Sequence, residues 1–77
     1  MKVKGYIHKD TGIALIVREP DDGIELPLEA AAIKQNAEEK TFDTDDNLTG
    51  FDRKAAVREI NDKGYFVNKA HVIFRES

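Results

Sequence analysis

The side chains that serve as nucleophiles in acyl transfer are scarce in this sequence. It contains no cysteine, and its one serine is Ser77, the last residue. Nucleophilic catalysis needs a hydroxyl or thiol held rigidly against a base, and chain ends hold such geometry poorly. We therefore expect no Ser/His/Asp or Cys/His catalysis. The threonines, which fall in predicted turns away from either histidine, are Thr11, Thr41, Thr44 and Thr49.

Paired carboxylates are a second arrangement with catalytic potential, and fifteen acidic residues supply several pairs. General acid–base catalysis by a carboxyl group needs a pKa raised by burial. A chain of 77 residues has little interior to offer. We therefore expect solvated carboxylates, no catalytic residue and no enzymatic activity. The neighbouring acids, all in or beside predicted turns, are Asp21/Asp22, Glu38/Glu39 and Asp43/Asp45/Asp46.

The segment from Asp45 to Gly50 resembles the start of a calcium-binding EF-hand loop, with oxygen-bearing side chains at alternate positions followed by glycine. The pattern then fails, because Arg53 and Ala56 stand at the ninth and twelfth positions, where the loop needs further ligands. Turn and helix-capping chemistry explains these residues more simply. We expect no metal site, with weak cation binding by this segment as the alternative.

His8 and His71 are the only histidines, and they lie on the first and last predicted strands. If these strands pair, the rings come close, but two histidines are too few for a zinc site. The five glycines are scattered singly and form no phosphate-binding loop. We expect no cofactor.

The charge of the chain is unevenly distributed, although its formal net charge is only −3. Residues 38–52 contain six acidic residues and one basic residue, whereas residues 53–77 contain six basic and three acidic residues. An acidic segment of this kind attracts a basic surface. With catalysis excluded, we expect a binding domain whose partner is another protein. The residues expected to contact the partner are Asp43, Asp45, Asp46 and Phe51.

One alternative for the partner stays open. It is weak nucleic-acid binding, with Tyr6 as a stacking surface, although the isoelectric point of about 5.3 opposes it. Self-association through the edge of a sheet is compatible with either partner. The basic residues that would carry nucleic-acid binding, from a first hairpin and a second helix, are Lys2, Lys4, Lys9, Lys54 and Arg58.

Alternating and continuous apolar runs predict strands in the first third of the chain. In residues 2–8, apolar and polar side chains alternate, and residues 9–12 predict a turn. Residues 13–17 are a continuous apolar run, which is typical of a central strand covered on both faces. A second turn over residues 19–23 precedes a short third strand at 24–26.

Helix-forming residues dominate the middle of the chain. Residues 28–39 predict a helix after Pro27, and residues 41–50 a polar connection. Asp52 predicts the N-cap of a second helix over 53–63, which Gly64 ends. Residues 65–74 predict one last strand, or two short strands if Asn68 and Lys69 form a turn.

Together these elements predict one α+β domain spanning residues 1–77. We expect an antiparallel sheet of about four strands in the order β-β-β-α-α-β, with both helices on one face. The sequence has no apolar stretch of the roughly 20 residues that span a membrane. We expect a cytoplasmic protein.

Overall fold

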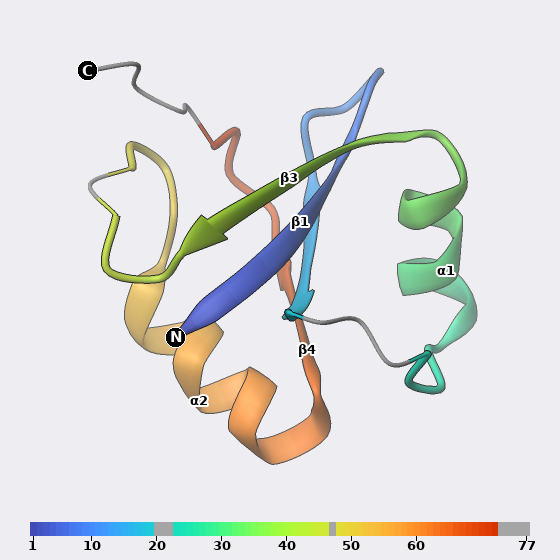
Figure 1. Ribbon diagram of the computed structural model, residues 1–77. Helices are drawn as coiled ribbons and strands as arrows, with labels where there is room; N and C mark the ends of the chain where they lie inside the picture. Colours follow the sequence, from blue (N-terminus) through green and yellow to red (C-terminus); the bar gives the residue numbers. More distant parts are fainter. Residues whose placement is uncertain (20–22, 47, 73–77) are drawn as a thin grey trace.

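The structure is a computed structural model, and it describes residues 1–19, 23–46 and 48–72. It contains a four-stranded antiparallel sheet and two helices, which confirms the predicted α+β class (Figure 1). Neither helix in the described part of the chain has the length and the hydropathy that a membrane span requires. Along the chain the elements are β1 (Lys2–His8), β2 (Ala14–Arg18), α1 (Leu28–Gln35), β3 (Ala37–Asp43), α2 (Arg53–Lys63) and β4 (Tyr65–Asn68).

The order of the elements differs from the predicted β-β-β-α-α-β, because the third strand follows α1 instead of preceding it. Residues 24–26 form no strand. Ile24 and Leu26 are half-buried and pack against the core beside α1. A strand here has no place beside β2, because β1 and β4 pair with its two edges. The apolar alternation of residues 24–26 thus reflects packing and not strand pairing.

The segment predicted to end the first helix and begin a polar connection is instead β3. Helix α1 ends at Gln35, four residues earlier than the sequence predicts, and residues 37–43 pair with β1 along its whole length. Glu38, Glu39 and Lys40 favour a helix by intrinsic propensity, but that preference is weak. Pairing with β1 and burial of Phe42 outweigh it.

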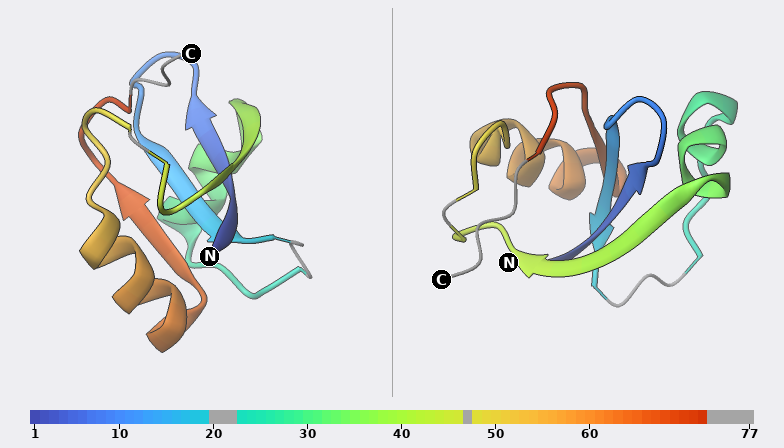
Figure 2. Two further views of the ribbon diagram at one scale, coloured as in Figure 1. Left: turned by 60° about the vertical axis from the view of Figure 1, so that its left-hand side comes forward. Right: turned by 90° about the horizontal axis from the view of Figure 1, so that it is seen from above.

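The two helices cover opposite faces of the sheet, which corrects the prediction of both on one face (Figure 2). Successive residues of a strand point to opposite faces, so the apolar run of β2 needs cover on both. We call these the α1 face and the α2 face. The α1-face cluster contains Tyr6, Leu15, Val17 and Ala30, and the α2-face cluster contains Val3, Ala14, Ile16, Phe42, Ile60 and Val72.

Local signals at both ends of α2 act as the sequence predicts. The Asp52 side chain accepts a hydrogen bond from the Ala55 N–H, and Gly64 ends the helix in the left-handed conformation at φ 90°. The last strand, β4, ends at Asn68, where the alternative prediction placed a break. Residues 73 and 74 of the longer prediction lie outside the described residues.

Candidate functional site

Strand β3 lies at one edge of the sheet, in the strand order β3-β1-β2-β4. In an antiparallel pair, residues alternate between pointing their backbone groups toward the partner strand and away from it. The Thr44 N–H donates to the Met1 carbonyl at 2.9 Å, and the register then directs residues 38, 40 and 42 toward β1. The N–H and C=O groups of Ala37, Glu39 and Thr41 therefore point away from the sheet.

This open edge ends at Asp43, where the chain turns back on itself. The backbone N–H of Asp43 donates to Oδ2 of Asp46 at 3.0 Å, and the Asp43 carbonyl accepts from the Asp46 N–H at 3.0 Å. Both outward backbone groups of Asp43 are thus used within the turn. The groups available to a further strand are those of Ala37, Glu39 and Thr41, which we call the β3 edge.

The three aspartates predicted to bind a partner lie together in this turn. Asp43 Oδ1 accepts hydrogen bonds from the Asp45 N–H at 3.0 Å and from the Met1 amino group at 3.2 Å. The bond from the Asp45 N–H, followed by that from the Met1 amino group, lowers the pKa of the Asp43 carboxyl below its usual 3.8. The side chains of Asp43 and Asp46 therefore stabilise the turn. The Asp45 side chain is exposed, and its Oδ1 lies 3.9 Å from a guanidinium nitrogen of Arg53.

Phe51 lies beside the acidic turn, but its ring serves mainly to complete the core. It is half-buried and meets Phe42 edge to face, with ring centroids 5.4 Å apart. With Leu48, Arg53 and the exposed aspartates it lines a hollow of about 190 Å³. The structure thus brings Phe51 together with Asp45 and Asp46, with only part of its ring accessible.

Sequence reasoning included Glu38 and Glu39 in the acidic segment, but it placed them in a helix and missed the edge strand that carries them. Glu39 and Asp43 share the α1 face of the strand, while Glu38 and Lys40 share the α2 face with Phe42. Glu38, Glu39 and Lys40 are all exposed. Thr41 and Phe42 both have high strand propensity, and this pair could have indicated the strand. The helix-forming residues before the pair predicted a helix instead.

The basic residues of the nucleic-acid alternative are spread over separate surfaces. Lys2 and Lys4 lie on the α1 face of β1, and Lys9 lies in the turn at the other end of that strand. Lys54 and Arg58 are exposed on α2, which covers the opposite face. The structure does not gather them, and the alternative stays a prediction that a mobility-shift assay with DNA and RNA at low salt would test.

The predicted stacking role of Tyr6 meets a specific obstacle. Its side chain is 5% exposed in the α1-face cluster, and the Lys34 ammonium lies 5.0 Å from the ring centroid. A nucleic-acid base therefore cannot stack on this ring without displacing α1. Lys4, the other neighbour in that prediction, lies 3.9 Å from the Glu19 carboxylate.

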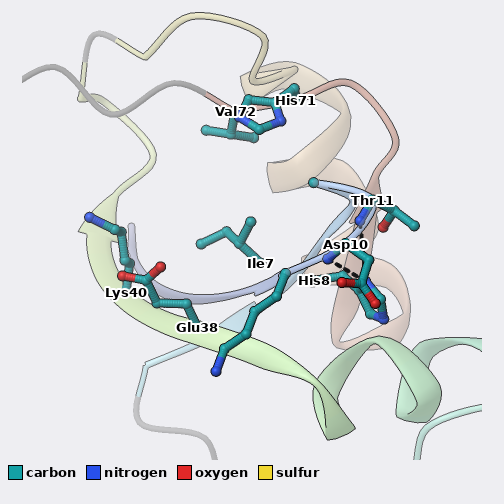
Figure 3. Close-up of a pocket in the computed structure, with 10 residues that line it drawn as sticks. Ile7, His8, Asp10, Thr11, Glu38, Lys40, His71 and Val72 are labelled. Atoms are coloured by element: carbon teal, nitrogen blue, oxygen red, sulfur yellow. Dashed lines mark hydrogen bonds between the residues drawn. The ribbon is translucent and has the colours of Figure 1, made fainter.

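Both histidines line a hollow of about 380 Å³ between the β1–β2 hairpin and the segment after β4 (Figure 3). His8 Nδ1 accepts hydrogen bonds from the backbone N–H groups of Asp10 and Thr11, at 3.2 and 3.3 Å. Figure 3 shows Glu38 and Lys40 across the hollow from His71, so the ionisable groups on its rim do not converge. In residues 1–19, 23–46 and 48–72, no group of three side chains is placed to hold a metal ion.

Comparison with known proteins adds no relative to this description. No protein-family model, curated protein or solved structure that was searched matches the chain.

Proposed function

We propose that this protein is a non-enzymatic binding domain whose partner is another protein, held along the β3 edge and beside the acidic turn. The supporting observation is the run of outward N–H and C=O groups at Ala37, Glu39 and Thr41, which leads directly into Asp43 and Asp45. An exposed edge of this kind accepts an extended segment of another chain as an additional strand.

The energetics of strand addition favour a modest affinity. Each backbone hydrogen bond contributes about 0.5–1.5 kcal/mol net, because water is displaced from both groups. The loss of translational and rotational freedom offsets much of that total. Side-chain contacts must therefore supply the rest of the binding free energy. The exposed charged side chains of β3 and the Asp45 carboxylate are the groups nearest to the edge that can make such contacts.

A proline substitution at Thr41 tests the edge itself. The Thr41 N–H points away from β1, so Thr41→Pro removes an outward donor and leaves the β1–β3 hydrogen bonds in place. Thr41→Val is the matched control, because it removes the hydroxyl and keeps the N–H. We expect a partner captured by the wild type to bind Thr41→Val and to be lost from Thr41→Pro.

Hydrogen exchange on the captured complex gives the second readout. We expect the Glu39 and Thr41 amides to exchange with water in the free wild-type protein, because they point away from β1, and we expect an added strand to protect both. Equal capture by Thr41→Pro and the wild type, with Glu39 and Thr41 amide exchange in the wild-type complex unchanged from the free protein, would overturn the proposal. Far-UV circular dichroism of both variants establishes that the sheet is intact.

A further inference from the structure

We infer that the β3 edge selects an extended segment of another protein with basic side chains four residues apart, in preference to a second copy of this chain. This inference rests on the proposed function. It follows from where the strand register places the charges beside the open backbone groups.

The α1 face of β3 carries two carboxylates beside the position of a neighbouring strand, those of Glu39 and of Asp43, whose Oδ1 also accepts from the Met1 amino group and the Asp45 N–H. Glu39 and Asp43 are four residues apart on this face, with Thr41 between them. Side chains opposite each other on paired strands interact, and opposite charges stabilise the pair. A segment with lysine or arginine at its first and fifth positions places one basic group opposite each carboxylate.

Antiparallel pairing of two β3 edges places like charges opposite each other. Outward-pointing residues must face outward-pointing residues, so registers centred on residues 38, 39, 40 and 41 each pair open groups of the two copies and oppose charged side chains. The register centred on Glu38 opposes the two Glu38 carboxylates. The register centred on Lys40 opposes the two Lys40 side chains, and the register centred on Thr41 opposes Glu39 to Asp43 twice. The register centred on Glu39 pairs Glu38 with Lys40 but opposes the two Glu39 carboxylates.

On the α1 face of β3 itself, a basic strand is therefore the occupant that meets only opposite charge. A self-paired edge meets at least one like-charge pair in each of these registers, which destabilises it. Exposed Asp45, just beyond the end of the edge, adds to the attraction for a basic segment. The charge pattern thus points to a heterologous partner.

Peptide titrations followed by NMR of the full-length protein test this selection. The probe is acetyl-Lys-Val-Thr-Val-Lys-amide, in which the lysines stand four apart. The control peptide, acetyl-Val-Lys-Thr-Lys-Val-amide, has the same composition, but its lysines stand two apart and meet only one carboxylate. We expect shifts at the Glu39 and Thr41 amides and binding about threefold tighter for the probe, for one additional charge pair.

Variants of the protein separate charge selection from edge binding. Glu39→Gln should remove the preference between the two peptides, whereas Glu25→Gln, at an exposed position outside the sheet, should retain it. Equal affinity of the wild type for both peptides, with shifts at Glu39 and Thr41, would overturn the charge selection and leave the proposed function intact. Peptide shifts confined to other residues would overturn the selection at this edge, while the Thr41→Pro capture independently decides the proposed function.

Self-association is measured in the same samples. Sedimentation that shows a dimer, with Glu39 and Thr41 amide shifts that depend on protein concentration, would identify a second copy as the occupant and overturn the inference. A monomer whose Glu39 and Thr41 amides respond more strongly to the four-apart peptide supports it.

Discussion

The side-chain oxygen of Asn68 accepts a hydrogen bond of 3.2 Å from the backbone N–H of Asp52, the residue that caps α2. Asn68 is 2% exposed, and its amide also donates to the carbonyls of Gly50 and Ala70, at 3.0 and 2.7 Å. The buried side-chain amide at the end of β4 therefore connects three segments. These are the N-cap of α2, the loop residue Gly50 before that helix, and Ala70 after β4.

Replacing Asn68 with alanine should destabilise the fold by about 3 kcal/mol. The substitution removes three hydrogen bonds and leaves partner groups without their protein contacts, and each buried unsatisfied group costs about 1–3 kcal/mol. Urea unfolding measures the change. Asn61→Ala is the control, because Asn61 is exposed and accepts one surface bond from Arg18; its effect should stay within about 0.5 kcal/mol. Equal effects of the two substitutions would contradict the role of Asn68.

Alanine substitutions at Gly12 and Gly23 distinguish the cost of backbone strain from the cost of steric overlap. Both have a positive φ, 75° and 76°, which costs a non-glycine residue about 1–2 kcal/mol. A Cβ at Gly12 would overlap the His71 ring, whereas one at Gly23 has no heavy atom of the described chain within 4 Å. Gly12→Ala should therefore cost at least about 1 kcal/mol more in unfolding free energy than Gly23→Ala.

A second substitution identifies the source of that difference. In the Gly12→Ala background, His71→Ala removes the ring that the new methyl group meets. Thermal unfolding should then show part of the lost stability restored. If His71→Ala is equally destabilising with or without Gly12→Ala, the contact between the hairpin and the segment after β4 does not cause the effect.

The contrast between α2 and β3 shows which elements this sequence specifies locally. Asp52 and Gly64 act on the helix termini next to them, and the predicted bounds of α2 agree with the structure. Whether residues 37–43 form a helix or a strand depends instead on pairing with β1, whose residues lie 29 to 41 positions earlier in the chain. Local propensity at Glu38 and Glu39 favours a helix, and no nearby residue opposes it strongly enough.

The candidate site was predictable to the extent that it is local. Asp43, Asp45 and Asp46 lie in one turn because they are neighbours in sequence, and their proximity was expected. The edge beside them follows from strand order, which depends on long-range contacts. The placement of helices on both faces was implicit in the apolar run of β2, since such a run needs cover on each side.

The Asp43 carboxyl should titrate below 3.8, because its ionised form accepts hydrogen bonds from the Asp45 N–H and the Met1 amino group. A folded-state pKa below the unfolded value gives a stability contribution that is present above the unfolded pKa. That contribution is lost as the pH falls through the folded value. Carbon-detected NMR of the side-chain carboxyl measures the midpoint directly. A midpoint at or above 3.8 would contradict these contacts, and Asp43→Asn should remove the corresponding pH dependence of unfolding.

Removing the cap of α2 should weaken the helix without affecting the Asn68 contact to its backbone. Asp52→Ala eliminates the carboxylate that accepts from the Ala55 N–H, and loss of such a cap costs about 1 kcal/mol. Asp52→Asn keeps a side-chain acceptor and should retain most of that stability. Asp62→Ala is the charge-matched control, since Asp62 lies near the C-terminal end of the helix, where a negative charge opposes the helix dipole. Urea unfolding should show a lower free energy of unfolding for Asp52→Ala and no decrease for Asp62→Ala. An equal decrease for both variants would mean that net charge, and not capping, causes the loss of stability.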